Sequence, residues 1–472
     1  MLPKKFCRFV IPSIISMWIF ALYTMVDGIF VARGVGEYAL AAVNLSMPYT
    51  IFIFSVGLMM ATGTSTLMAI FLGEGKEEEA RNTFNQNLII LVAVGATISL
   101  LTWFNLKKIA YFLGAGPETI GYVKGYLGWI SVFAVFFVVS YNMEIFVKTD
   151  GCPPLQMAGV MTSAVTNIVL DYVFVMKLHM GVEGAAIATG IAQVVSTTMF
   201  SLYFGFRSRR LRFGSFKWNL KLYRRIIPLG MSDSITELSG GLVIFLFNHM
   251  ILSIIGNKGV VSYTVISYVN TLALNSMAGI SQGVQPLVSF HYGAGERGKY
   301  RRLFSYSIIA AGISTVVFLV IAEILPQAAV GLFLDKRDQE LFAYSVSALR
   351  MYGLSFAIVG FNVVTAGFFT AVERPVYSVV ISSCRSFLLL SACLIILTEL
   401  IGENGIWLSP AVSESLCLII TLLFFLRYKS GRRAGGEQRV DASVYKQDDS
   451  IYRAKCARKH LAEHNRVNSN EL

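Results

Sequence analysis

Stretches of about 20 apolar residues recur twelve times along this chain, and they restrict its fold more than any other feature. Lipid offers no water to backbone groups, so each stretch has to form a helix across the bilayer. With 55% hydrophobic and only 14% charged residues, an ordinary soluble protein is excluded. The sequence predicts an all-α integral membrane protein with twelve transmembrane helices. The expected spans are 9–31, 41–72, 84–104, 123–147, 156–176, 184–206, 226–255, 260–290, 303–325, 342–371, 376–398 and 405–426.

Basic residues concentrate in one set of alternate loops. When the spans are threaded in turn and the C-terminal tail is left aside, one side of the membrane holds 19 Lys and Arg, with Lys148 in the loop 148–155, and the other holds eight, including Lys336 and Arg337. Cytoplasmic loops are rich in Lys and Arg. We therefore expect a multi-pass protein of the cell (inner or plasma) membrane with both termini inside. This orientation accounts for the net charge of +12 without nucleic acid.

Signatures of enzymes, metal centres and cleaved targeting segments are missing from the sequence. HExxH and His/Cys clusters do not occur, and the six cysteines lack metal or redox spacing. A GxGxxG in HYGAGERGKY follows an apolar span, with no strand before it, so its glycines indicate a turn. The apolar run after Lys4, Lys5 and Arg8 is longer than a signal-peptide core and predicts an uncleaved first span. We expect no enzyme, cofactor or disulfide.

The two halves of the chain are related to one another. Gly63 and Gly73 meet Gly283 and Gly293 at one offset of 220 residues. Six spans repeated in the same orientation predict two lobes related by an axis along the membrane normal. The predicted divisions are 1–206 for the N-terminal six-helix lobe, 207–225 for a basic cytoplasmic linker, 226–427 for the C-terminal six-helix lobe and 428–472 for a polar, disordered cytoplasmic tail.

Acidic and amide side chains inside the first and fifth spans are the candidates for chemistry. An ionisable group at membrane depth generally faces a protein interior or a water-filled cavity and marks an ion or substrate path. Asn167 and Asp171 are four residues apart and share a helix face. Asp27 and Asp171 each lie about six residues before the outer end of their spans, hence at one depth. Thr189, early in the sixth span, enters at the same level.

Two carboxylates, an amide oxygen and a hydroxyl form a cluster of hard oxygen ligands. Such ligands suit a sodium ion, and a proton would equally relieve the repulsion between the carboxylates. The sequence leaves both ions open, with Asp27, Asn167 and Asp171 as the expected sodium ligands. In the second half the matching positions are Phe247 and Ala392 or Cys393, so the site is expected in the first half. The alternative is a purely structural role between packed helices.

The second half has intramembrane charges of its own. Asp233 and Glu237 are four residues apart in the seventh span, and Arg350, Arg385 and Glu414 follow in later spans. Glu237, with Asp233, could meet a cationic substrate or a second ion. In the alternative interpretation, Arg350 or Arg385 neutralises Glu237 in a structural pair.

An ordered set of motifs over about residues 5–427 resembles the MATE (multidrug and toxic compound extrusion) family, in particular its DinF/MepA-like branch. The motifs are YTMVDGIFVARGVG, ALAAVNLSMP, NIVLDYVFV, GVEGAAIATGIAQ, GISQGVQPLVSFHYGAG and GIWLSPAVSE. The resemblance implies a twelve-helix exporter with two six-helix lobes that exchanges sodium ions or protons for organic cations.

Family roles can be carried over position by position. The first-span acid of the family falls on Asp27, the fifth-span Asn and Asp on Asn167 and Asp171, and the proline kink of the first helix on Pro12. The seventh-span acid of some branches falls near Glu237, shifted by about one residue. The tenth-span acids of the sodium-coupled branch are missing from 352–371.

The expected function is therefore multidrug efflux by ion-coupled antiport and alternating access. The expected partners are the lipid bilayer and drug-like organic cations, and the protein is expected to act as a monomer. One alternative is a flippase for lipids or polysaccharide precursors, whose cleft would need many basic groups, whereas Arg350 and Arg385 are the basic residues expected within the spans. Another is a receptor or scaffold without transport, which would need no buried acids.

Overall fold

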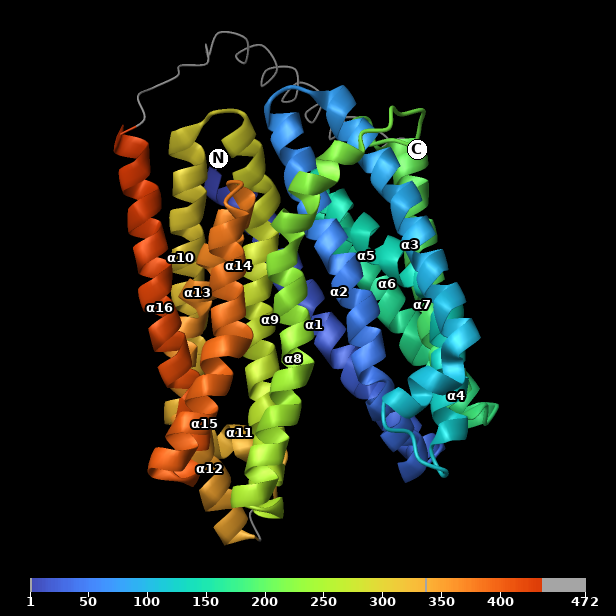
Figure 1. Cartoon of the computed structure of the whole chain (residues 1–472), viewed down its shortest axis with the longest axis vertical. Helices are drawn as coiled ribbons and strands as arrows, with labels where there is room; N and C mark the ends of the chain where they lie inside the picture. Colours follow the sequence, from blue (N-terminus) through green and yellow to red (C-terminus); the bar gives the residue numbers. More distant parts are fainter. Residues whose placement is uncertain (1, 336–337, 435–472) are drawn as a thin grey trace, which may run out of the picture. The chain divides into compact units, whose positions relative to one another are not determined.

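Sixteen α-helices make up most of the part that this computed structural model describes, residues 2–335 and 338–434 (Figure 1). Short π-helical or 3-10 segments, labelled η, extend or connect several of them. The first half contains α1 (Leu2–Gly34), α2 (Glu37–Gly73), α3 (Glu77–Phe112), α4 (Ile120–Val132), α5 (Ala134–Thr149), α6 (Pro153–Asp171), η1 (Tyr172–Lys177), α7 (Gly181–Leu202) and η2 (Tyr203–Arg207).

The second half repeats this order after a linker. It contains η3 (Leu220–Leu222), α8 (Tyr223–Ile254), α9 (Asn257–Gly293), α10 (Arg297–Leu319), η4 (Val320–Ile324), α11 (Pro326–Gly331), α12 (Gln339–Gly353), α13 (Phe356–Ala371), α14 (Pro375–Ser383), η5 (Cys384–Leu388), α15 (Leu389–Ile401) and α16 (Glu403–Ala434). The described residues up to Phe424 form one unit, and the rest of α16 belongs to a second.

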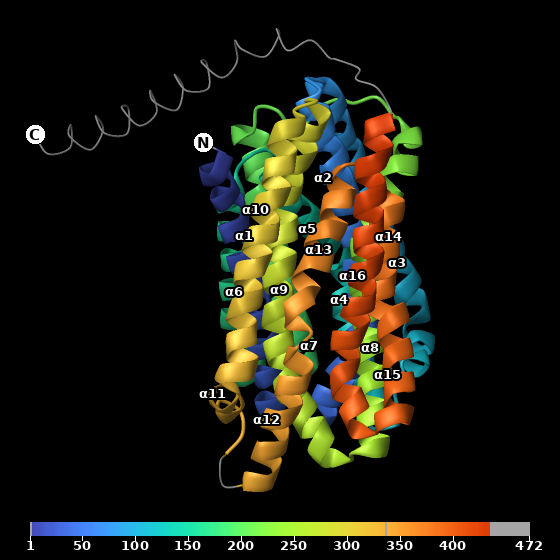
Figure 2. The ribbon, with the colours of Figure 1, turned by 90° about the vertical axis from the view of Figure 1, so that its left-hand side faces the viewer.

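The predicted all-α membrane fold is confirmed. Among the described residues, nine helices are long and apolar enough to span a membrane, and two bent pairs raise the number to eleven. The remaining predicted span, 260–290, is covered by α9, which has 37 residues but is not among the helices that are apolar enough by this measure. It packs against α10 and α13 (Figure 2). The bends, 53° between α4 and α5 and 40° between α12 and α13, fall at matching places in the two repeats.

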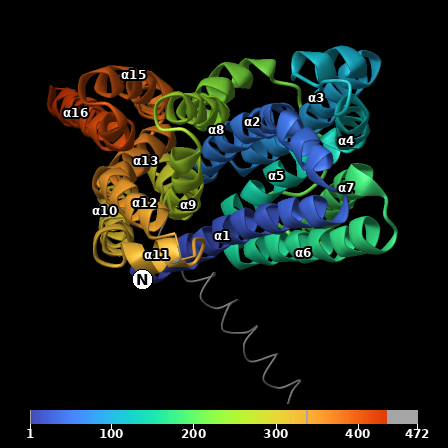
Figure 3. The same cartoon turned by 90° about the horizontal axis from the view of Figure 1, so that it is seen from below.

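Glycines allow the two halves to touch backbone to backbone. α2 packs on α8 and α9, and α1 packs on α9 and, within its own half, on α6 (Figure 3). A Cβ on Gly73 would lie 2.0 Å from the Phe290 carbonyl oxygen, and one on Gly293 would lie 2.2 Å from that of Ile70. Ile70 and Phe290 are themselves 220 positions apart, so this seam is symmetric in the repeat.

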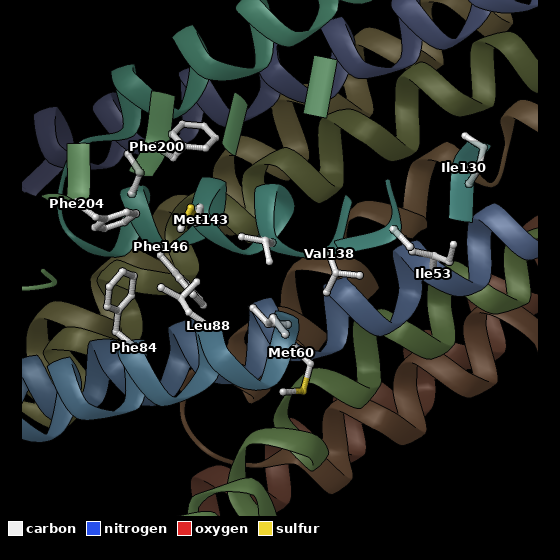
Figure 4. Close-up of a cluster of buried hydrophobic side chains, with 14 of the residues drawn as sticks. Ile53, Met60, Phe84, Leu88, Ile130, Val138, Met143, Phe146, Phe200 and Phe204 are labelled. Carbon is white, nitrogen blue, oxygen red and sulfur yellow. The ribbon is translucent and has the colours of Figure 1, made fainter. Parts of the chain in front are cut away.

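The N-terminal lobe has an aromatic core between α3, α5 and α7 (Figure 4). Phe84 lies at its centre, with ring centroids 4.7 Å from Phe204 and 5.8 Å from Phe146. The linker is fastened beside this core, because Asn85 donates to the Arg212 carbonyl oxygen (3.0 Å) and accepts from the Gly214 amide (3.1 Å). These contacts hold the linker against the start of α3.

One part of the predicted topology is wrong. Lys148 was expected in a cytoplasmic loop, but it lies inside α5 and is only 1% exposed. The helix continues to Thr149 because the apolar run has no breaker before Gly151 and Pro153. Lys336, Arg337 and residues 435–472 of the expected tail lie outside the described residues.

Candidate functional site

The predicted acids of the first lobe lie together where α1 packs on α6 and η1. Asp171 is the last residue of α6, and the chain changes there to the π-helical η1, a geometry frequent at functional sites. Asp171 is fully buried, and Asn167, one turn earlier, is 1% exposed. Asp27 reaches them from α1, and its carboxyl group interacts directly with that of Asp171.

Hydrogen bonds fix the amide of Asn167 and leave its oxygen free. Asn167 Nδ2 donates to Thr189 Oγ1 at 3.2 Å, and Thr189 Oγ1 donates to the Ala185 carbonyl oxygen at 3.0 Å. The Thr189 proton is therefore already used within α7. Thr189 orients Asn167, so that the amide oxygen and not the hydroxyl is the open ligand.

Four buried oxygen atoms in this cluster have no hydrogen-bond donor within the described part of the chain. They are Asp27 Oδ1, Asn167 Oδ1 and both carboxylate oxygens of Asp171. Among the described residues, no Lys, Arg or His forms an ion pair with Asp27 or Asp171. Uncompensated buried carboxylates are strongly unfavourable. The arrangement is chemically suited to take up a cation or a proton.

The cluster and its surroundings offer oxygen ligands, which suit hard cations. Tyr23 and Tyr126 lie within electrostatic range of both Asp27 and Asp171. The described residues contain no group of three or more His, Cys, Asp and Glu side chains that could hold a metal. The open ligands are all oxygens, which is the ligand type of sodium.

Pro12 lies near the start of α1, far from Asp27 along the helix. It removes one backbone donor, and a proline in this position usually bends a helix. Here α1 runs as one helix from Leu2 to Gly34, and Ser16 Oγ donates to the Pro12 carbonyl oxygen at 2.8 Å. The kink implied by the family resemblance stays a prediction.

The acids of α8 face the first lobe. Thr62 Oγ1, on α2, donates to Asp233 Oδ2 at 2.8 Å, across the boundary between the lobes. Glu237 lies one turn further along α8 and forms no ion pair with a described residue. Arg385 Nη1 instead pairs with Glu414 Oε1 at 3.4 Å, while Arg350 is exposed. Neither arginine neutralises Glu237 in this structure.

Two charged residues in α5 were missed by the sequence reasoning. Glu144 Oε1 accepts a hydrogen bond from Gln156 Nε2 at 2.6 Å, and Lys148 lies one turn later on the same helix. Lys148 is within electrostatic range of both Glu144 and Asp233. The signal was present in the sequence as an acid and a base four residues apart in the otherwise apolar FVVSYNMEIFVK.

Two repeats of membrane helices, with uncompensated acids buried in one of them, define the architecture of a secondary transporter. The family model MatE matches residues 12–173 and 235–395, which is more than half of the chain. The chain belongs to the MatE family, a family of transporters and not of enzymes.

Relatives and solved structures agree with this assignment at low sequence identity. "Multidrug export protein MepA" of Staphylococcus aureus (strain MSSA476) is 22% identical over 422 residues, covering 89% of this chain and 92% of MepA. The structure "Outward-facing conformation of a multidrug resistance MATE family transporter of the MOP superfamily" is 23% identical, with a TM-score of 0.86, and the match covers 92% of this chain and 97% of that one. "Reverse polarity of binding pocket suggests different function of a MOP superfamily transporter from Pyrococcus furiosus" is 22% identical, with a TM-score of 0.85 and coverage of 92% and 97%.

Proposed function

We propose that this protein is a multidrug efflux antiporter of the cell membrane, which exports organic cations in exchange for sodium ions or protons. The proposal rests on four buried oxygens of Asp27, Asn167 and Asp171, which have no hydrogen-bond donor among the described residues. The name of the related MepA, a multidrug export protein, supports the direction and the cargo class. The expected topology, with both termini inside, keeps its excess of cytoplasmic Lys and Arg after Lys148 is removed from the count.

Exchange follows because the coupling ion and the cationic cargo compete for the protein, which carries one of the two at a time. An ion from outside cancels one of the two negative charges of Asp27 and Asp171, and the reduced repulsion lets α1 and α6 pack more closely. The closer packing favours the conformation that opens to the other side, where the ion leaves and cargo enters. Each elementary charge moving down a potential of about 100 mV supplies about 2.3 kcal/mol. Exporting a monovalent cation against the same potential costs the same energy, so each ion that enters in excess of the exported charge sustains roughly a fiftyfold cargo gradient. All residues of the proposed ion site belong to one chain, which supports a monomer as the transporting unit.

Ethidium uptake into inside-out vesicles tests this function. Vesicles carrying the wild type should accumulate ethidium when a sodium or a proton gradient is imposed separately, and the gradient that works identifies the coupling ion. Asp27→Asn and Asp171→Asn, at matched expression, should abolish the accumulation. Uptake by both variants at the wild-type rate would overturn the proposed coupling site, and no uptake by the wild type under either gradient would overturn the antiporter.

A flippase for anionic lipid or polysaccharide precursors is the second candidate that the structure bears on. The buried Lys148 is a basic group of the kind that such a cleft would need. However, three acids face this one base. Glu144 and Asp233 lie within electrostatic range of Lys148, and Glu237 lies within electrostatic range of Asp233. The balance of charge therefore favours a cationic cargo. The related Pyrococcus furiosus protein, described by reversed pocket polarity, illustrates that polarity distinguishes functions in this fold.

A further inference from the structure

Lys148 is a buried cation that no ion pair holds in place. Its side chain belongs to α5 of the first lobe and is 1% exposed. It lies within electrostatic range of Glu144 on its own helix and of Asp233 on α8. Among the described residues, no carboxylate oxygen lies within 4.0 Å of its amino group. The ammonium group is therefore near two carboxylates without being locked to either.

The acids around Lys148 outnumber it. Glu144 is held by Gln156, and Asp233 is held across the lobe boundary by Thr62. Glu237 adds a third carboxylate within electrostatic range of Asp233. When these groups are ionised, three negative charges face one positive charge, and Lys148 compensates only part of them. A buried group with unbalanced negative charge attracts a further cation.

A line of aromatic rings runs from this acid group to the ion site of the first lobe. The Tyr141 ring lies 4.5 Å from that of Phe54, Phe54 stacks on Phe20 at 5.7 Å, and Phe20 meets Tyr23 edge to face at 5.3 Å. Tyr23 lies within electrostatic range of both Glu144 and Asp171. Aromatic faces next to carboxylates suit an organic cation that carries its own flat ring, because such rings attract positive charge and stack.

We propose that Lys148 is a built-in counter-ion of the acids between the lobes, and that an organic cation must displace it from Glu144 and Asp233 in order to bind. This inference rests on the proposed export of organic cations. While the site is free of cargo, the tethered ammonium group compensates part of the negative charge of the carboxylates and stabilises their burial. When a flat cation stacks against Tyr141 and approaches the same carboxylates, like charges repel and the flexible lysine side chain moves away.

Competition between Lys148 and the cargo lowers the affinity of the site for the cargo, in addition to the effect of Lys148 on the stability of the protein. A cargo ion that enters the site loses part of its attraction to Glu144 and Asp233 to repulsion by Lys148. Removing the lysine charge leaves the carboxylates fully available, and a unit charge several ångströms away in a partly screened protein site corresponds to about a tenfold change in affinity. Moderate affinity helps an exporter, because cargo has to leave on the far side.

Equilibrium binding of ethidium to the purified, detergent-solubilised protein tests the proposal without any ion gradient. Lys148→Met should lower the Kd for ethidium about tenfold relative to wild type. Lys148→Arg keeps the charge and should stay within about twofold. Lys76→Met, a change of the same kind at a half-exposed lysine in the turn after α2, is the matched control and should also bind as the wild type does. A Kd of Lys148→Met equal to or above that of the wild type would overturn the proposal.

A second pair of variants keeps the test decisive if Lys148→Met does not fold. Glu144→Gln alone should weaken ethidium binding, and the double variant Glu144→Gln with Lys148→Met should bind about tenfold more tightly than Glu144→Gln. Equal affinities of these two proteins would overturn the counter-ion role. The proposed function is tested separately. If the wild type binds ethidium but does not transport it in the vesicle assay, the proposed function is overturned while the binding test of Lys148 still stands. Absence of ethidium binding by every variant would overturn both.

Discussion

Two buried acid clusters, one in each lobe, are satisfied in opposite ways. In the C-terminal lobe, Glu414 accepts from Asn362 Nδ2 at 2.7 Å and pairs with Arg385 at 3.4 Å, and Thr421 Oγ1 donates to Asn362 Oδ1 at 3.0 Å. In the N-terminal lobe, Asp27 Oδ1 and both carboxylate oxygens of Asp171 lack a hydrogen-bond donor among the described residues, and neither carboxylate has a cationic partner there. A charge that its own lobe satisfies supports the fold, whereas a charge left unsatisfied is available to bind.

The largest expected effect of this difference is on transport. Asp171→Asn and Asp27→Asn each remove a charge from the ion site, and each should reduce gradient-driven ethidium transport at least about a hundredfold, given about 3 kcal/mol for a close charge contact in a partly screened site. Glu414→Gln, compared at equal amounts of folded protein, should retain most of the wild-type rate. Vesicle uptake of ethidium measures both. A similar loss in all three variants would remove the distinction between the lobes.

For the free energy of unfolding we expect the reverse order, with the larger loss in Glu414→Gln than in Asp27→Asn. Glu414→Gln leaves Arg385 without its carboxylate partner in a nearly buried position and should lower the free energy of unfolding by about 3 kcal/mol. Replacing both partners by leucine should recover much of this loss. Asp27→Asn relieves repulsion at Asp171 and should leave stability unchanged or raise it. Denaturant titration in detergent gives the comparison, and a marked loss of stability in Asp27→Asn would contradict it.

The glycine contacts between the lobes, unlike the charge clusters, should respond to substitution in the same way in both halves. Gly73→Ala and Gly293→Ala each force a methyl group against a backbone carbonyl oxygen, at 2.0 and 2.2 Å, and should destabilise the protein by similar amounts, about 1 to 3 kcal/mol. Gly298→Ala in the first turns of α10, with nothing within 4 Å, is the control and should be neutral or slightly stabilising. Melting temperatures that fall for one seam variant alone would argue against a symmetric seam.

The smallest effect is expected at Thr189. Thr189→Val removes the hydroxyl that accepts from Asn167 at 3.2 Å, so the amide is held less well. A lost hydrogen bond of about 1 kcal/mol predicts about a fivefold weaker dependence of transport on the coupling ion. Thr189→Ser keeps the hydroxyl and should behave as the wild type. Unchanged ion dependence in Thr189→Val would mean that Asn167 needs no such support.

The sequence was sufficient to locate the acids of the first lobe, because helices rise by a constant step. Counting residues from the outer span ends set Asp27 and Asp171 at one depth, and helical spacing set Asn167 beside Asp171. In the structure all three lie together. Their role as an ion site stays a prediction.

The contacts between the lobes could not be predicted in the same way. Hydropathy does not define where a span ends to within a turn, so Lys148 was assigned to a loop although α5 extends past it. The 53° bend between α4 and α5 has no proline or glycine signal at Phe133. The bond from Thr62 to Asp233 depends on how α2 meets α8, which is decided by packing across 171 residues of sequence.

Ion-dependent stabilisation of the purified protein tests the central claim most directly. An ion that binds only the folded protein raises its melting temperature. We predict that the wild type and Glu414→Gln gain stability when sodium replaces potassium at constant ionic strength, or when the pH is lowered toward 6, whereas Asp27→Asn combined with Asp171→Asn gains none. An equal gain in the double variant would contradict the assignment of the ion site to the N-terminal lobe.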